Sequence, residues 1–109
     1  MIPYYEKKWQ YLNWHQKGRC PIAWEKDGEI VMLHELHHAG IHDTKLNRKR
    51  WPLLIDSLLN LKLVNHNYHM MWPSWGRISD LEADRKERFL ERHPKICEFV
   101  NTVGAKGAG

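Results

Sequence analysis

The spacing of apolar residues at the start of the chain predicts a helix. Tyr5, Trp9 and Leu12 follow the i, i+4, i+7 spacing that places side chains on one helix face. Gly18 follows as a residue that often ends a helix. We therefore expect a helix over residues 3–17.

The next two apolar runs predict a β-hairpin. They cover residues 20–24 and 30–33, and residues 25–29 between them contain Asp-Gly, a dipeptide typical of hairpin turns. We expect the second strand to continue through residues 34–38.

The rest of the chain alternates short apolar runs with polar breaks. Residues 39–50 read as a polar loop, and Pro52 suits the first turn of a helix. Ser79, followed by a Glu three residues later, matches a helix capping box. We expect a helix over 53–59, a strand over 60–64, a helix from 66 to 71, a helix from 79 to about 92, and a last helical piece over 96–103.

Composition indicates one small folded domain, and the mixture of expected helices and strands assigns it to the α+β class. The chain has 109 residues, of which 42% are hydrophobic and 28% are charged, and this balance is typical of a globular domain. No uncharged stretch approaches the roughly 20 residues of a membrane span, and the first residues lack the apolar core of a signal peptide. Cys20 and Cys97 are far apart and form neither a disulfide framework nor a zinc-binding pair. These features predict a cytoplasmic protein that does not bind membranes.

Charge and histidine content point to an acidic partner. The formal net charge is +4, which favours nucleic acid as a partner, and the chain contains eight His and six Trp. Lys45, Arg48, Lys49 and Arg50 are concentrated in the predicted loop, where they are candidate contacts to DNA phosphates. Such contacts position a duplex without reading its sequence.

Three histidines occur in an ordered pattern that suits phosphodiester hydrolysis. His37 and His38 end a predicted strand, Asn60 begins the next, and His69 follows on a predicted helix. Neighbouring residues on a strand face opposite sides, so His37 and His38 cannot both bind one metal from a regular strand. One imidazole can hold a divalent cation, while the other takes a proton from water near neutral pH.

This pattern resembles the HNH endonuclease family, and small bacteriophage HNH proteins in particular. The resemblance covers about residues 20–76 and rests on three segments: Leu36-His37-His38, Asn60 to Val64, and Tyr68-His69-Met70. It implies a ββα-metal core, in which a β-hairpin and a helix hold one metal. Residues 3–17 and about 79–103 would then be flanking helical extensions of a single nuclease domain covering 1–109.

The resemblance also implies a role for each matching residue. His38 would be the general base, and Asn60 would brace the loop that orients it. His37 and His69 would bind the metal, which would stabilise charge on the scissile phosphate. Cleavage would leave 5′-phosphate and 3′-hydroxyl ends. His66 lies three residues before His69 and is a further candidate for contact with metal or phosphate.

Two departures from the family pattern affect the expected metals. Many members carry four cysteines that bind a structural zinc, but here only Cys20 matches, with Ala23, Asn65 and Tyr68 at the other positions. We therefore expect no structural zinc and a core held by tryptophan packing. A further family His is replaced by Pro73, which leaves two protein ligands for the catalytic metal. This favours Mg²⁺ or Mn²⁺, with Zn²⁺ or Ni²⁺ as alternatives.

The tryptophans divide into two expected groups. Trp9, Trp14, Trp24 and Trp51 are expected in the core. Trp72 and Trp75 flank Pro73, where they either pack on the helix end or stack on a base, and packing is the favoured reading.

Three functional hypotheses follow from the sequence. The first is a metal-dependent endonuclease that cuts or nicks DNA as a monomer or weak homodimer. The second is a nuclease that assists phage DNA packaging and acts with a terminase partner. The third is a catalytically inactive HNH fold that binds DNA, which the Pro73 substitution supports and the presence of His38 opposes. RNA as a substrate is not excluded by any residue.

Overall fold

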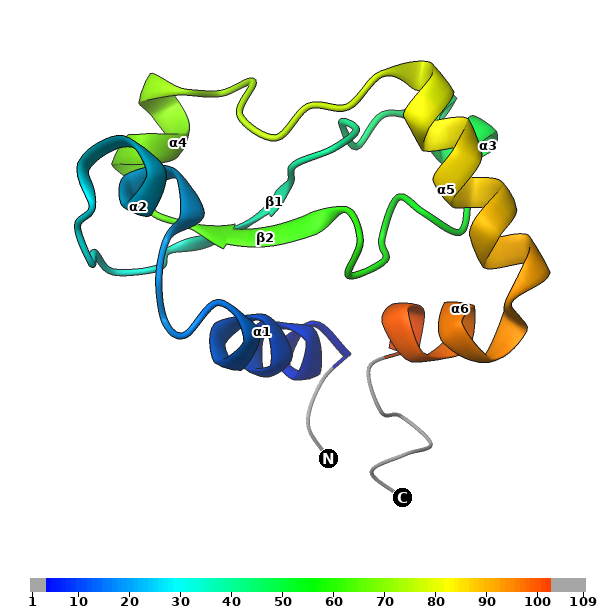
Figure 1. Cartoon of the computed structure of the whole chain (residues 1–109), viewed down its shortest axis with the longest axis horizontal. Coiled ribbons are helices and arrows are strands. Elements are labelled where there is room, and N and C mark those ends of the chain that lie inside the picture. The colour runs from blue at the N-terminus through cyan, green and yellow to red at the C-terminus, as the bar shows by residue number, and fades with distance from the viewer. Residues whose placement is uncertain (1–3, 103–109) are drawn as a thin grey trace. The chain divides into compact units, whose positions relative to one another are not determined.

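The computed structural model describes residues 4–102, and it describes side chains from residue 6 onward. This range contains six helices and two strands (Figure 1). They are α1 (Tyr4–His15), α2 (Pro21–Asp27), β1 (Glu35–His38), α3 (Lys45–Arg50), β2 (Leu61–Val64), α4 (His66–Met71), α5 (Asp80–Arg92) and α6 (Pro94–Thr102). The α+β class expected from the sequence is therefore confirmed.

The chain divides into two compact units, each made of two segments. Unit 1 contains residues 1–37 and 62–75, and unit 2 contains residues 38–61 and 76–109. The division falls between His37 and His38 in β1 and between Leu61 and Lys62 in β2.

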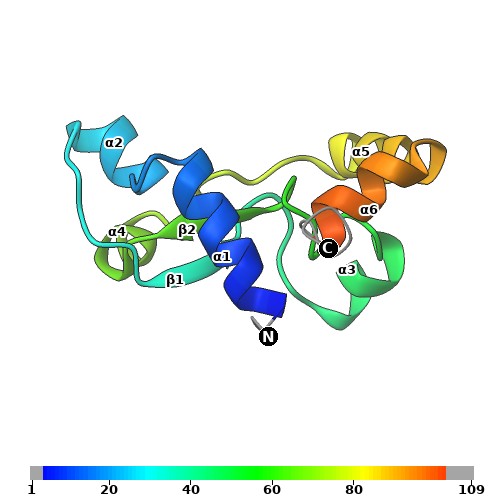
Figure 2. The ribbon, with the colours of Figure 1, turned by 90° about the horizontal axis from the view of Figure 1, so that it is seen from below.

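Helix α1 confirms the first sequence prediction over its described residues, while residue 3 lies outside them. Its buried side chains are Lys8 and Leu12, one turn apart. Figure 2 shows α1 crossing β2 from below, and the Gln16 side chain that follows α1 pairs with the backbone of Leu63. The amide of Gln16 both donates to the Leu63 carbonyl and accepts from its N–H, each at 2.9 Å.

The predicted hairpin over residues 20–33 is wrong, because residues 21–27 form helix α2. Pro21 stands in the first turn, where a missing N–H costs nothing, and Gly28 ends the helix in the left-handed conformation. The N–H of Gly28 bonds to the carbonyls of Ala23 and Trp24. The Asp-Gly dipeptide therefore marks a helix end. The sequence signal was ambiguous, because a hairpin turn and a helix end both need a residue at positive φ.

The two strands form an antiparallel sheet of order β1-β2. The N–H of His34 bonds to the Val64 carbonyl, and that of Ala39 bonds to the Asn60 carbonyl, so the two strands run in opposite directions. The strand ending at His38, the strand after Asn60 and the helix carrying His69 are confirmed as elements. Their order is β, β, α.

The core of unit 1 lies between α1, α2, β2 and α4. Helix α2 packs against α4. The fully or nearly buried apolar residues of this unit are Leu12, Cys20, Ile22, Ala23, Leu63 and Val64.

Two predictions for residues 39–59 are wrong, because the expected loop contains a helix and the expected helix is absent. Residues 45–50 form helix α3, because the Thr44 hydroxyl caps its first turn by accepting from the N–H of Asn47. The expected helix over residues 53–59 is a series of turns instead. The buried carboxylate of Glu87 accepts the N–H groups of Leu53 and Leu54 at 2.9–3.2 Å, which supports this turn conformation from outside the segment.

Helices α5 and α6 confirm the last two helix predictions, and residue 103 lies outside the described part of the chain. The Ser79 hydroxyl accepts the N–H of Glu82 at 3.1 Å, as the capping pattern predicted. Helix α5 packs against α6 (Figure 1), and the N–H of Leu58 reaches the Val100 carbonyl. The buried apolar residues of unit 2 are Ala39, Ile41, Trp51, Leu54, Ile55, Leu58, Leu61, Ala83, Leu90 and Val100.

The tryptophan predictions hold only in part. Trp51 is buried, with 1% of its surface exposed, but Trp14 is 73% and Trp24 45% exposed. Trp14 follows the buried Leu12 by two positions and so lies on the opposite side of α1. Helix α2 buries Ile22 instead, and the Arg19 guanidinium covers the Trp24 ring at 4.1 Å.

Among the described residues, no helix has both the length and the apolar character needed to cross a membrane.

Candidate functional site

In unit 1, the two predicted metal ligands lie against each other. His37 on β1 is buried, and His69 on α4 is half-buried. Their ring centroids are 4.1 Å apart, with the planes tilted by 46°. Asn65 places His69 by starting α4, because its side-chain oxygen accepts the N–H groups of Asn67 and Tyr68.

Glu35, a carboxylate that the sequence did not single out, lies on the same strand as His37 and holds His69. Its Oε1 is 2.6 Å from Nδ1 of His69, and its Oε2 is 3.4 Å from Nδ1 of His66. The hydrogen bond from His69 is the main influence that keeps the pKa of Glu35 below its ordinary value, against the effect of burial. Glu35 precedes His37 by two positions, so strand alternation places both on one face and would have identified it.

The contact with Glu35 also decides which nitrogen of His69 remains for a further ligand. A carboxylate on Nδ1 favours the tautomer with hydrogen there, which leaves a lone pair on Nε2. This arrangement of carboxylate and histidine is the usual support for a histidine that binds a metal. His66, the further candidate, shares Glu35 with His69 but is exposed.

The donor set in unit 1 fits a metal only as a two-ligand arrangement. Within residues 4–102, no three or more His, Cys, Asp or Glu side chains are grouped so that they could hold a metal ion. His37 and His69 supply two imidazoles, which suit Mn²⁺, Ni²⁺ or Zn²⁺. The sequence predicted these two ligands, and metal binding by them stays a prediction.

In unit 2, His38 contacts a group of charged side chains. Its Nε2 is 3.0 Å from Oδ1 of Asp56, and both side chains are largely buried, at 18% and 28% exposure. Arg48 donates to both oxygens of Asp56, at 2.8 and 3.2 Å, and to Asp43 at 2.5 Å. Burial opposes ionisation of Asp56, but the bonds from Arg48 and His38 outweigh it and lower its pKa.

Asp56 was not predicted, although the sequence contains a signal for it. It is the one charged residue in the run from Leu53 to Leu59, so it stands out among apolar neighbours. A charge in such a run requires a partner when the run is buried. Its partners come from α3 and β1, and no local spacing points to them.

Asn60 ties the loop that follows His38 to the turn that contains Asp56. Its side chain is buried, accepts the N–H of Ile41 at 2.8 Å, and donates to the carbonyls of Ile41 and Ile55 at 3.2 and 2.9 Å. Gly40 passes so close that a Cβ there would stand 2.6 Å from the Asn60 oxygen. The geometry is that of a brace, while a contribution of Asn60 to catalysis stays a prediction.

Arg77 holds the same loop from the other side. Its Nη1 donates to the carbonyls of His38 and Ala39, at 2.5 and 3.1 Å, and its Nη2 lies 2.7 Å from Nδ1 of His42. Burial lowers the pKa of Arg77 from its ordinary value. Both ends of the loop after His38 are therefore fixed by side chains of unit 2.

The four basic residues predicted to contact DNA lie on helix α3 rather than in a loop. Arg48 is committed to Asp43 and Asp56, and Arg50 pairs with Asp80 at 3.0 Å while stacking on Trp51. Lys45 and Lys49 are exposed. The two lysines are therefore more accessible to a phosphate than the two arginines.

An apolar cluster contains Cys20 and Ala23, two positions that the resemblance to the HNH family matches with zinc-binding cysteines. Cys20 is fully buried, and its sulfur accepts the N–H of Asn65 at 3.3 Å. Ala23 lies in the same cluster, and Trp72 and Trp75 pack against it. The expected packing role of these two tryptophans is confirmed.

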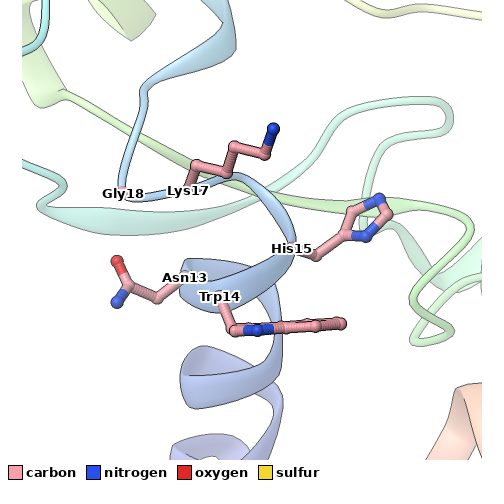
Figure 3. A pocket seen from close by; sticks show the side chains of 5 residues that line it. All are labelled: Asn13, Trp14, His15, Lys17 and Gly18. Carbon is pink, nitrogen blue, oxygen red and sulfur yellow. The ribbon is translucent and has the colours of Figure 1, made fainter.

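A hollow of about 770 Å³ opens at the end of α1 (Figure 3). Its walls come from Asn13, Trp14, His15, Lys17 and Gly18, which all lie within residues 13–18. In Figure 3 the Trp14 and His15 rings point to the same side of the helix end. No residue predicted to act in the site lines this hollow.

Comparisons of the chain with models of protein families, with curated proteins and with solved structures gave no match.

Proposed function

We propose that this chain is a metal-dependent endonuclease of the HNH type that hydrolyses phosphodiester bonds in DNA. The observation that carries the proposal is the pair His37 and His69, whose rings lie 4.1 Å apart with Glu35 on Nδ1 of His69. The ordered residue pattern and the strand, strand, helix sequence of β1, β2 and α4 support the same reading.

In this proposal, His37 and His69 would bind one divalent ion, with Glu35 fixing the ring of His69. When bound, the ion would offset negative charge that develops on the phosphate and on the leaving oxygen. Only two protein ligands are assigned to it.

His38 is the base in this proposal. His38 accepts a proton from water, the water oxygen forms a bond to phosphorus, and the bond from phosphorus to the 3′ oxygen breaks. The 3′ oxygen is protonated as it leaves, which gives 5′-phosphate and 3′-hydroxyl ends. Asn60 and Arg77 hold the loop after His38, so that the imidazole keeps a fixed position.

DNA phosphates would be held by the exposed cations of α3. Lys45 and Lys49 carry this role, because the charges of Arg48 and Arg50 are paired with carboxylates. Such contacts depend strongly on salt and do not read base sequence. Cleavage is therefore expected to show loose sequence preference and to weaken as salt rises.

A plasmid-nicking assay tests the proposal. Purified protein is incubated with supercoiled DNA and Mg²⁺, Mn²⁺, Zn²⁺ or Ni²⁺, beside His38→Ala and His69→Ala. The matched control is His93→Ala, which removes an exposed histidine outside both groups. We expect nicking by the native protein and by His93→Ala, and its loss in the other two variants, with DNA binding retained.

The other outcomes separate the rival functions. DNA binding without cleavage in any metal would favour the inactive DNA-binding fold. Cleavage that begins only when a phage terminase is added would favour the packaging nuclease. Normal cutting by His69→Ala would show that the helical ligand is wrongly assigned.

A further inference from the structure

The contacts of His38 define which of its two ring nitrogens is available for chemistry. Its Nε2 is 3.0 Å from Oδ1 of Asp56. An ionised carboxylate carries no hydrogen, so the hydrogen in this bond belongs to the imidazole. A neutral His38 in this contact therefore has hydrogen on Nε2 and a lone pair on Nδ1.

Asp56 is itself held in place from its other side. Arg48 forms a two-pronged contact with it, through Nη1 to Oδ2 at 2.8 Å and Nη2 to Oδ1 at 3.2 Å. The third donor of Arg48, Nε, bonds to Asp43, so the guanidinium is fixed by two carboxylates. The carboxylate of Asp56 thus has little freedom to turn away from His38.

The backbone on both sides of this contact is also tied together. Asn60 bonds to Ile55, the neighbour of Asp56, and to Ile41, three residues after His38. A surface ion pair has no such support, and its geometry is easily lost. The His38–Asp56 contact is therefore built into unit 2 rather than a chance meeting of two exposed side chains.

From this geometry we propose that Asp56, clamped by Arg48, is a positioning residue that orients His38 and fixes its tautomer, so that Nδ1 is the atom that accepts the proton from water. The inference rests on the proposed function, because it concerns the same base. It also changes the role of Arg48, which acts through Asp56 and not by contact with DNA. A carboxylate that fixes the tautomer of a catalytic histidine is a general device in hydrolytic enzymes.

The test compares Asp56→Asn with Asp43→Asn. Both changes keep the side-chain shape, remove one negative charge and take one carboxylate from Arg48, but only Asp56 contacts His38. We expect Asp56→Asn to lower kcat for plasmid nicking about 10- to 100-fold at unchanged KM. Asp43→Asn removes one of the two carboxylates that hold Arg48 but leaves the His38–Asp56 contact in place, so we expect a smaller loss of kcat, of about threefold or less.

A second measurement reads the tautomer of His38 without requiring activity. Nitrogen-15 NMR of labelled histidine, assigned with His38→Ala, is expected to show hydrogen on Nε2 of His38 in the native protein and in Asp43→Asn. In Asp56→Asn, we expect a mixture of tautomers, with circular dichroism confirming the fold.

The outcomes distinguish this inference from the proposed function. An unchanged His38 tautomer in Asp56→Asn, or an equal loss of kcat in Asp43→Asn, would overturn the role of Asp56. If the native protein cleaves no DNA, the proposed nuclease fails, while the NMR comparison still decides whether Asp56 fixes His38.

Discussion

Replacing Asn60 by Ala should destabilise the protein more than any surface substitution. The change removes three hydrogen bonds and leaves the buried N–H of Ile41 and the carbonyls of Ile41 and Ile55 without this partner. Each of the two bonds to carbonyls is worth about 1 kcal/mol, and the buried N–H of Ile41 left unpaired costs about 1–3 kcal/mol. The expected loss is about 3–5 kcal/mol, a large share of the roughly 5–15 kcal/mol that stabilises a typical domain.

Urea denaturation followed by tryptophan fluorescence measures this loss, since Trp51 is buried in the same unit. With a slope of about 2 kcal/mol per molar urea, the midpoint should fall by roughly 1.5–2.5 M. Asn47→Ala is the matched control, because the Asn47 amide makes one exposed bond, to the His42 carbonyl. A midpoint for Asn60→Ala no lower than that of Asn47→Ala would refute the bracing role.

Gly40 extends this prediction to a double-mutant cycle. A Cβ at residue 40 would lie 2.6 Å from the Asn60 oxygen and 3.4 Å from the Ile78 side chain, so Gly40→Ala should be destabilising. Once Asn60→Ala has removed that oxygen, the same change should cost less, with a coupling of about 0.5–3 kcal/mol. Strict additivity of the two changes would contradict the close approach.

Two further predictions concern single carboxylates. Glu87→Ala removes the acceptor for the N–H groups of Leu53 and Leu54 and should lower the free energy of unfolding in urea by about 2–4 kcal/mol. Glu91→Ala, an exposed change on the same helix, should lower it by under about 0.5 kcal/mol. Equal urea midpoints for the two variants would contradict the role of Glu87 as acceptor for these N–H groups. Glu35→Ala should weaken Ni²⁺ binding about 10- to 100-fold in calorimetric titration, and unchanged affinity would mean that Glu35 does not orient a metal ligand.

The elements that the sequence predicted well are those with a local cause. Helix α5 begins where the Ser79 hydroxyl caps it, and α4 ends before Pro73, so nearby residues decide both boundaries. Strand β2 was found for a similar reason, whereas only residues 35–38 of the strand expected over residues 30–38 form β1. Short apolar runs next to polar breaks restrict the local backbone strongly.

The wrong predictions share a different cause. Gly28, at φ 65°, suits a hairpin turn and a helix end equally well, and contacts of α2 with α4 decided between them. Residues 53–59 have an apolar pattern that fits a helix, but Glu87 binds two of their N–H groups from more than 30 positions away. No window of neighbouring residues contains that information.

The residues of the candidate site show the same difference between local and long-range causes. The sequence alone proposed His37, His38, Asn60 and His69 as candidates, because their order and spacing resemble a family pattern. Only the tertiary structure showed that Glu35 backs His69 and that Asp56 holds His38.

The physical reason is that some contacts join neighbouring residues and others join residues far apart in the sequence. A strand, a cap or a turn depends on residues a few positions apart, whose backbone geometry is nearly fixed. The partners of His38 and Arg48 are 18 and 8 positions away, and they meet because burial of a charge in an apolar turn requires hydrogen-bonding partners. The sequence by itself determined which residue types are present for chemistry, and the fold decided which of them face each other.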